Sequence, residues 1–266
     1  MMTQEVGPTN PFGTLVGSLR QHAPSVTRLA LDYQRPHDLR RATELLSVEG
    51  AQALGGGTDL LVTIREGLAR PEQLVDLRGL PGIDTIQRTA GGGVRIGAAA
   101  GVAALAADQT IRERFPALAM ACDSVGSPAL RNMGTIAGSL CQRPRCWYFR
   151  SGIPCLKSTG STCPAVDGQN RHLAILGGGP CHAVHGSDPA VALVALDATL
   201  LLEGPQGARS VPIAEFFVLP DPDPRRENVL LPGEFITAIE LPHDSSGGRQ
   251  RYTKVLHRGA WDFALA

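Results

Sequence analysis

The sequence has neither an excess of charge of one sign nor a long hydrophobic run. It contains 25 lysines and arginines against 25 aspartates and glutamates, so no basic surplus would attract a nucleic-acid backbone. Its longest apolar stretch, residues 191–202, is interrupted by Asp197 and is too short to span a bilayer. The first 25 residues contain no apolar core of the kind found in signal peptides. We therefore expect no nucleic-acid partner and no insertion into a membrane.

Several catalytic and cofactor motifs are missing as well. The glycine-rich segment ALGGGTDLLV, residues 53–62, has neither the G-x-G-x-x-G spacing of dinucleotide-binding turns nor the Gly-Lys-Ser/Thr of a P-loop. No Ser-His-Asp arrangement or paired-carboxylate motif argues for hydrolytic chemistry. With 266 residues, of which 43% are apolar, the chain can nevertheless bury the core of one to two domains, with a fragment of a third.

What the sequence does have is a cluster of cysteines. Five of the six lie between residues 141 and 181, and prolines stand beside three of them. Such clustering in a loop-like segment favours a metal or iron-sulfur site over thiols scattered through a core. The spacing matches neither a zinc finger nor a bacterial ferredoxin, and leaves an iron-sulfur cluster, zinc, disulfides and unliganded thiols as alternatives. In an oxidising compartment, disulfides would be the main rival to a cluster.

Glycines punctuate two polar segments of the chain. One is the turn at residues 55–57, and the other is VGSPALRNMGTIAGSLCQ, residues 125–142, which runs directly into the cysteines. Glycine lets a backbone approach a ligand closely and present consecutive N–H groups to an anion. Such a turn between a strand and a helix can bind a pyrophosphate. Each turn alone is more typical of a structural role, but the two together favour phosphate binding.

Hydrophobic periodicity predicts alternating helices and strands. We expect helices at residues 36–46, 101–107, 111–121 and 188–197, and strands at 52–54, 74–76, 94–96, 198–203 and 234–241. Residues 211–216 are predicted to form a strand or an extended connection. This mixture indicates an α+β or α/β fold.

Five segments carry more specific motifs. They are GGGTDLL at residues 55–61, RNMGTIAGSLCQRPRCWYFRSG at 131–152, STCPAVDGQN at 161–170, HAVHGSDPAVALVALDA at 182–198 and YTKVLHRGAWDFALA at 252–266. In sequence and in order they resemble the flavin-binding medium subunit of the molybdenum hydroxylases. This family includes xanthine dehydrogenase, carbon monoxide dehydrogenase and aldehyde oxidoreductase. The resemblance runs from about Leu29 to the last residue.

The resemblance implies an α+β fold, namely the two-subdomain FAD-binding fold of these medium subunits (PCMH-type), with a truncated C-terminal domain. It divides the chain into a flexible N-terminal extension (1–25), an N-terminal FAD-binding subdomain (26–80), a second FAD-binding subdomain (81–235) and the start of the truncated C-terminal domain (236–266). The second subdomain is expected to include an iron-sulfur loop at residues 141–181.

The resemblance also implies which residues bind FAD. Both turns are expected to bind the pyrophosphate through backbone N–H groups, assisted by the hydroxyls of Thr58 and Thr135. Asp188 and Lys254 match family residues near the flavin, with a helix N-cap as the alternative role of Asp188. The full set is Leu54, Gly55, Gly56, Gly57, Thr58, Asp59, Leu60, Asn132, Gly134, Thr135, Gly138, Ser139, Asp188 and Lys254.

Some members of the family carry an inserted loop that holds a [4Fe-4S] cluster, and residues 146–181 resemble this loop. The four cysteines that match its ligands are Cys146, Cys155, Cys163 and Cys181. Four thiolates can complete such a cluster, and nearby basic side chains could offset its negative charge. These basic side chains are Arg143, Arg145, Arg150 and Lys157. We interpret Cys122 and Cys141 as small buried hydrophobic residues.

An electron-relay role follows from the resemblance. In such complexes a molybdenum-cofactor large subunit oxidises an aldehyde or N-heterocycle, a [2Fe-2S] small subunit passes the electrons on, and FAD delivers them to an external acceptor. We therefore expect an oxidoreductase subunit whose cofactors are FAD and a [4Fe-4S] cluster. The alternatives are a stand-alone flavin oxidoreductase and a non-catalytic metal-binding remnant. A cytoplasmic location is expected, with periplasmic export alongside a Tat-dependent partner as the alternative.

Overall fold

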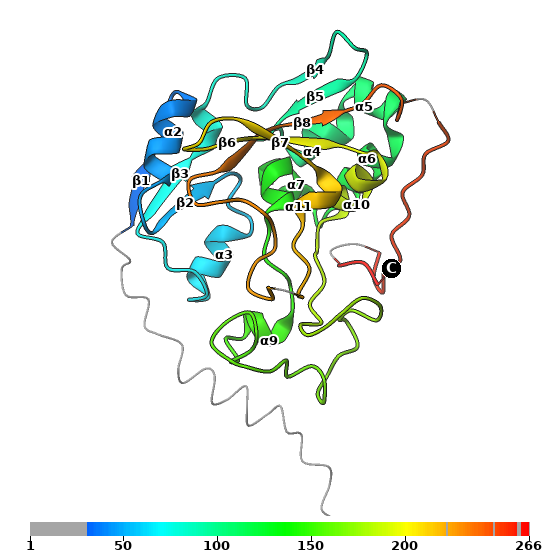
Figure 1. The fold of residues 1–266 in the computed structure, drawn as a ribbon. Coiled ribbons are helices and arrows are strands. Elements are labelled where there is room, and N and C mark those ends of the chain that lie inside the picture. Colours follow the sequence, from blue (N-terminus) through cyan, green and yellow to red (C-terminus); the bar gives the residue numbers. More distant parts are fainter. Residues whose placement is uncertain (1–30, 222, 247, 260–261, 266) are drawn as a thin grey trace, which may run out of the picture. The chain divides into compact units, whose positions relative to one another are not determined.

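The computed structural model describes residues 31–221, 223–246, 248–259 and 262–265. Within them the chain forms two β-sheets, a set of short helices and a long irregular segment that carries the cysteines (Figure 1). The N-terminal extension expected at residues 1–25 lies outside the described residues.

The first sheet is parallel and has the strand order β1-β3-β2. Its elements are β1 (Asp32–Gln34), α2 (Leu39–Leu46), β2 (Ala51–Leu54), α3 (Leu60–Arg65) and β3 (Gln73–Asp76), followed by the 3-10 helix η1 (Leu77–Gly79). Helix α2 begins where the Asp38 side chain accepts a hydrogen bond from the Arg41 N–H at 2.7 Å. It buries Ala42, Leu45 and Leu46, which share one face at helical spacing. Because the strands are parallel, the turn after β2 opens at their carboxyl edge, where ligands bind in open parallel sheets.

The second sheet is antiparallel and has the order β4-β5-β8-β6-β7. Its strands are β4 (Ile86–Arg88), β5 (Val94–Gly97), β6 (Thr199–Glu203), β7 (Arg209–Pro212) and β8 (Phe235–Leu241). Strand β8 is the central strand, and five of its seven side chains are buried. The domain boundary expected after residue 235 therefore falls inside this sheet. Strand β8 pairs with strands of the expected second subdomain, while the domain boundaries themselves stay predictions.

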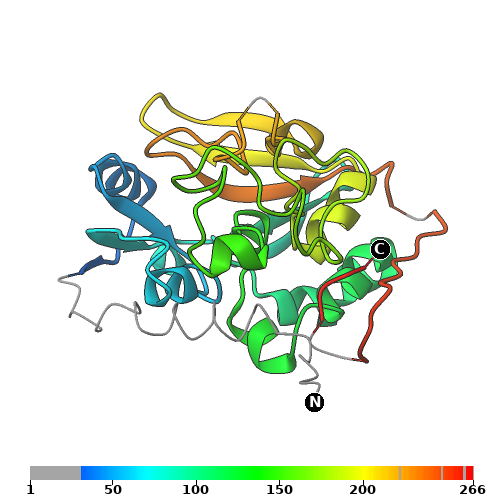
Figure 2. The ribbon, with the colours of Figure 1, turned by 90° about the horizontal axis from the view of Figure 1, so that it is seen from below.

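Short helices cover one face of the second sheet (Figure 2). The helices outside the first sheet and the cysteine segment are α4 (Val102–Ala107), α5 (Gln109–Arg114), α6 (Pro116–Asp123), α7 (Pro128–Met133), α8 (Ile136–Leu140), α10 (Asp188–Ala195) and α11 (Ile213–Phe216). The single helix expected at residues 111–121 is broken because Pro116 disfavours helical geometry at Phe115, which adopts φ −132° and ψ 54°. Residues 211–216, expected to be extended, divide between the end of β7 and α11. None of the helices in the described part of the chain has the length and apolar character needed to cross a membrane.

The cysteine segment between α8 and α10 has little regular structure. Helix α9 (Trp147–Arg150) interrupts it, and the rest of residues 141–187 consists of turns, bends and irregular chain. Figure 1 shows α9 and the neighbouring loops at one end of the structure, away from the two sheets. Such a segment has few backbone hydrogen bonds of its own, so its order depends on side-chain contacts or on bound groups.

Candidate functional site

The first glycine turn connects β2 to α3 and leaves no room for side chains. Gly57 adopts φ +73°, in the left-handed region that favours glycine. A Cβ atom at Gly56 would lie 1.8 Å from the carbonyl oxygen of Met133, a distance that real Cβ atoms do not reach. The turn therefore packs directly against the backbone of the second glycine segment, far away in the sequence.

Thr135 belongs to the second glycine segment, faces the first turn and is the N-cap of α8. Its hydroxyl accepts a hydrogen bond from the Gly138 N–H at 3.2 Å. An added Cβ atom would lie 2.6 Å from this hydroxyl at Gly55 and 2.9 Å from it at Gly138. The Gly134 carbonyl accepts a hydrogen bond from the Val102 N–H at 2.9 Å, which fastens the turn to α4. Thr135 thus sets the spacing of the two turns, and its hydroxyl can still donate its hydrogen to a ligand.

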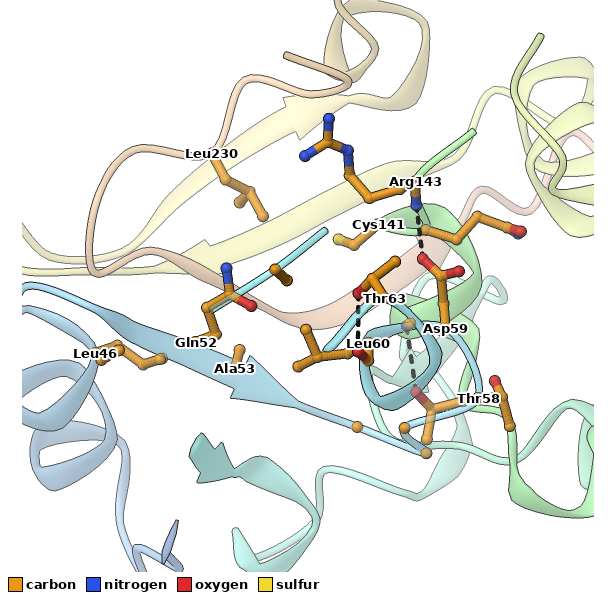
Figure 3. A pocket seen from close by; sticks show the side chains of 18 of the residues that line it. Leu46, Gln52, Ala53, Thr58, Asp59, Leu60, Thr63, Cys141, Arg143 and Leu230 are labelled. Atoms are coloured by element: carbon orange, nitrogen blue, oxygen red, sulfur yellow. Dashed lines mark hydrogen bonds between the residues drawn. The ribbon is translucent and has the colours of Figure 1, made fainter. Parts of the chain in front are cut away.

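A cavity of about 710 Å³ opens beside the joined turns (Figure 3). This volume is within the range of small-molecule sites. The backbone of the first turn forms one wall, and Leu46 of α2 and Gln52 of β2 form another. In Figure 3, Leu230 lies across the cavity from Gln52. Backbone N–H groups beside apolar walls suit a ligand that has both an anionic part and a ring.

A second cavity, of about 280 Å³, adjoins the same turns. The residues that line both cavities are Thr58, Asp59, Thr135, Gly138 and Gln142. Two cavities that meet at anion-binding turns fit a ligand with a central pyrophosphate and a ring system at each end. FAD has this build.

Lys254 and Asp188 form a buried ion pair beside the second cavity. Lys254 Nζ lies 2.8 Å from Asp188 Oδ2, and the side chains are 4% and 9% exposed. The Tyr252 hydroxyl donates to the other carboxylate oxygen, Oδ1, at 2.7 Å. Burial raises the pKa of Tyr252, and the Asp188 carboxylate raises it further. Tyr252 therefore stays protonated and remains a donor to Asp188.

The N-cap role considered for Asp188 is wrong, because Ser187 fills it. The Ser187 hydroxyl accepts a hydrogen bond from the Ala190 N–H at 3.2 Å. Asp188 is the first residue of α10, where its negative charge also suits the helix dipole. Its carboxylate is thereby free to bind Lys254 and Tyr252.

The remaining residues expected at the flavin do not all reach the two cavities. Leu54 is 6% exposed and lines neither cavity, whereas Leu60 lines the large one. Ser139 lines the second cavity, and its hydroxyl oxygen lies 2.8 Å from that of Ser187. Asn132 lines a different cavity, formed mainly by α4, α6 and α7. The structure therefore brings the two turns together with Leu60 and Ser139, but not with Asn132.

Sequence reasoning missed one wall of the large cavity. Residues 230–234, which precede β8, line it together with Gln142 and Arg143. Residues 230–234 carry no motif and reach the cavity because β8 pairs between β5 and β6. Gln142 and Arg143 could have been predicted to line the cavity, because they stand at the end of the second glycine segment.

All six cysteines are in the described residues, and all are free thiols. Cys122 is fully buried, and this burial raises its pKa to about 12. Cys141 is half-buried as a residue, but its thiol is enclosed, and burial raises its pKa to about 12 as well. Both thiols are therefore neutral at ordinary pH, in agreement with their interpretation as small hydrophobic residues.

The other four cysteines lie close enough to influence one another. Burial raises the pKa of Cys146, and the nearby Cys155 and Cys163 raise it further. Burial also raises the pKa of Cys181, and the nearby Cys163 and Cys146 raise it further. The charge of Lys157 offsets only part of this rise. No three His, Cys, Asp or Glu side chains in the described residues stand in a geometry that would hold a metal ion. The four thiols thus converge on one region without forming a closed set of ligands.

The basic side chains around the cysteines are paired with carboxylates. The contacts are Arg145–Asp59 (3.1 Å), Arg150–Asp59 (2.7 Å), Arg143–Glu227 (3.0 Å) and Lys157–Glu227 (2.9 Å). Asp59 lies two residues after the first glycine turn, and Glu227 belongs to the connection that leads into β8. The cysteine segment is therefore tied by charge to segments that form two walls of the large cavity.

Residues 27–244 match a protein family described as the FAD binding domain in molybdopterin dehydrogenase. The chain belongs to this family. It is 41% identical over 222 residues to the aldehyde oxidoreductase FAD-binding subunit PaoB of Escherichia coli (strain K12), covering 82% of this chain and 69% of PaoB. It is 28% identical to the carbon monoxide dehydrogenase medium chain of Hydrogenophaga pseudoflava, over 88% of this chain and 66% of the relative. The crystal structure of the Cu,Mo-CO dehydrogenase superposes with a TM-score of 0.66 at 27% identity, covering 88% of this chain and 66% of that one.

Membership of the family confirms the predicted α+β FAD-binding fold and FAD as the cofactor. The chain is an FAD-binding oxidoreductase subunit of the molybdenum hydroxylase type. It spans about two thirds of the length of these relatives, between 66% and 69%. The matched family region ends at residue 244, just after β8, which agrees with the place of this strand in the FAD-binding part.

Proposed function

We propose that this chain relays electrons from a molybdenum-containing oxidoreductase, which acts on an aldehyde or an N-heterocycle, to an external acceptor. The observation that carries the proposal is the direct contact of two glycine turns between two cavities. The 41% sequence identity to the aldehyde oxidoreductase subunit PaoB supports an aldehyde as the substrate. When bound, FAD supplies the transfer of one or two electrons at a time.

The chain's own residues would bind and orient this cofactor. The N–H groups of residues 55–57 and the hydroxyls of Thr58 and Thr135 would neutralise the pyrophosphate charge. Lys254, held by Asp188, would donate a hydrogen bond to the ligand in the second cavity. The apolar walls of the large cavity would exclude water from the ring that lies there.

We further propose that Cys146, Cys155, Cys163 and Cys181 hold a [4Fe-4S] cluster. Thiolates are the ligand form, and two features favour them here. Burial raises the pKa of Cys146 and of Cys181, but backbone N–H groups of Phe149 and Tyr148 offset part of the rise at Cys146, and the Lys157 charge offsets part of it at Cys181. Ligation would close a segment that has little secondary structure of its own.

The partners follow from the same reasoning. Relatives named as medium chains support a complex with a molybdenum-cofactor large subunit and a [2Fe-2S] small subunit. Oxidation of the substrate would then take place on another chain. We place the complex in the cytoplasm, with export alongside a Tat-dependent partner as the alternative.

The test is to purify the protein together with its partner chains and to measure its absorption spectrum, iron, sulfide, zinc and molybdenum. Flavin bands on a broad shoulder, with about four iron and four sulfide per FAD beyond those of the small subunit, are expected. Flavin and turnover without a molybdenum-containing partner would instead indicate a stand-alone flavin oxidoreductase. Zinc without flavin would indicate a metal-binding remnant.

A further inference from the structure

Asp59 lies two residues after the first glycine turn, but its carboxylate faces the cysteine segment. Oδ2 accepts a hydrogen bond from the Arg143 N–H at 2.8 Å, and Oδ1 accepts one from Arg150 Nη2 at 2.7 Å (Figure 3 shows the contact with Arg143). Arg145 Nη2 lies 3.1 Å from Oδ1. An aspartate in front of a helix usually caps it, yet this side chain makes no capping hydrogen bond to α3. All three contacts of the carboxylate therefore belong to the cysteine segment.

Arg150 connects this contact to Cys146, the first of the four cysteines proposed as cluster ligands. Its side chain is 11% exposed, and it also donates to the carbonyl oxygens of Pro144 and Arg143, each at 2.9 Å. Arg150 is the last residue of α9, whose N-cap is Cys146. One guanidinium thus holds the backbone just before Cys146 and binds Asp59 as well.

The negative charge of Asp59 affects how well the first glycine turn can bind an anion. Asp59 lines both cavities, and the negative charge of its carboxylate opposes a pyrophosphate bound to the nearby N–H groups. Arg150 and Arg145 compensate that charge. If the cysteine segment moves away, Asp59 keeps its charge and loses its partners. The turn would then face an uncompensated carboxylate.

We infer that Asp59 couples the binding of FAD to the ordering of the cysteine segment. The inference rests on the proposed function, in which Cys146 ligates a cluster. Ligation of Cys146 would hold Arg145 and Arg150 in place, and these arginines would neutralise the charge of Asp59. The first turn would then bind a pyrophosphate without repulsion from Asp59. Because such coupling is reciprocal, bound FAD would strengthen the retention of iron by the same factor.

The experiment measures the FAD dissociation constant by equilibrium dialysis, before and after anaerobic reconstitution of the purified full-length protein with iron and sulfide. Reconstitution should tighten FAD binding by about 10-fold in the wild type. Asp59→Asn removes the repelling charge, so FAD binding should lose its dependence on iron. Arg150→Gln removes the closer of the two cations at Asp59 and leaves only Arg145, so reconstitution should tighten FAD binding much less than in the wild type.

The matched control is Glu240→Gln, which removes the carboxylate of the exposed Arg95–Glu240 pair in the second sheet. It should keep the iron dependence of the wild type. Thermal unfolding of each variant checks that it is folded, and Arg150→Gln tests the inference even if Asp59→Asn does not fold. A wild type that retains no iron overturns the proposed cluster and this inference together. A wild type that retains iron but binds FAD equally with and without it, or an Arg150→Gln variant that keeps the full dependence, overturns this inference alone.

Discussion

Lys254 Nζ lies 2.8 Å from Asp188 Oδ2, with the two side chains only 4% and 9% exposed. The pair joins the segment after β8 to the first turn of α10, and the Tyr252 hydroxyl occupies the second carboxylate oxygen at 2.7 Å. Two charges removed from water are tolerated because each compensates the other. This contact therefore fixes the position of the chain beyond β8 at the second cavity.

Replacing Lys254 by methionine leaves the Asp188 carboxylate buried without its cation. We expect the free energy of unfolding to fall by about 3 kcal/mol, the typical cost of removing one partner from a buried pair. Urea unfolding at neutral pH measures it. Asp188→Asn in the Lys254→Met background should restore most of the lost stability, because an amide needs no counter-charge. No recovery in the double variant would mean that the ion pair does not account for the loss.

Gly56→Ala should weaken FAD binding more than any other single alanine substitution in the two turns. Its Cβ would lie 1.8 Å from the Met133 carbonyl oxygen, so the backbone must shift, whereas at Gly134 the nearest atom, the Leu130 carbonyl oxygen, is 3.1 Å away. We expect at least a loss on the order of 10-fold in affinity for Gly56→Ala and a smaller loss for Gly134→Ala. Gly91→Ala is the control, because an added Cβ there meets nothing within 4 Å. Equal FAD affinity in all three variants would exclude the glycine turns as the phosphate site.

The turns themselves were predictable, because glycines and a threonine at short spacing form a local signal. What each turn touches was not: the contact between Gly56 and Met133 depends on packing between distant segments. The same holds for Asp59, whose place in the first motif indicated a ligand contact, while its carboxylate binds Arg150. A motif specifies the local backbone, but the partner of a charged side chain is set by the tertiary fold.

For the helices and strands too, local features were predictable from the sequence and tertiary contacts were not. The strand at residues 234–241 was readable from its apolar pattern, but its place between β5 and β6 follows from pairing with strands remote in sequence. The expected domain boundary at residue 235 stays a prediction, and the strand that follows it pairs with strands from before it. The break in the helix at Phe115 had a local cause in Pro116, and was therefore readable in principle. Strand β4, a three-residue edge strand, carries too short a pattern to predict.

Asp76 gives the stability of the first sheet a dependence on pH. Burial raises the pKa of Asp76, but hydrogen bonds from Arg78 and Tyr33 outweigh this and lower it from 3.8 to about 2. A carboxylate whose pKa is lower in the folded state stabilises the fold above the unfolded value, and this contribution is lost as the pH falls through the folded value. We expect a loss of about 1–2 kcal/mol, reduced by solvent screening at the partly exposed Arg78.

The measurement compares urea unfolding of the wild type and Asp76→Asn at several pH values. The wild type should be more stable above pH 3.8, and its advantage should shrink as the pH falls toward about 2. Because other carboxylates titrate in the same range, the difference between the two proteins is the informative quantity. An advantage that stays constant across this window would show that Asp76 does not titrate as its hydrogen bonds require.

Serine substitutions distinguish the four proposed cluster ligands from the two buried thiols. Replacing Cys146, Cys155, Cys163 or Cys181 removes one thiolate, so each variant should lose most of its iron and the cysteine segment should become more sensitive to proteases. Cys141→Ser is the matched control. It lies in the same region, but burial keeps its thiol neutral by raising the pKa to about 12, so its iron content should equal that of the wild type. The pattern matters more than any single loss, because a general folding defect would lower iron in all variants alike. If Cys141 proves essential and Cys146 dispensable, a cluster exists but its ligands have been assigned incorrectly.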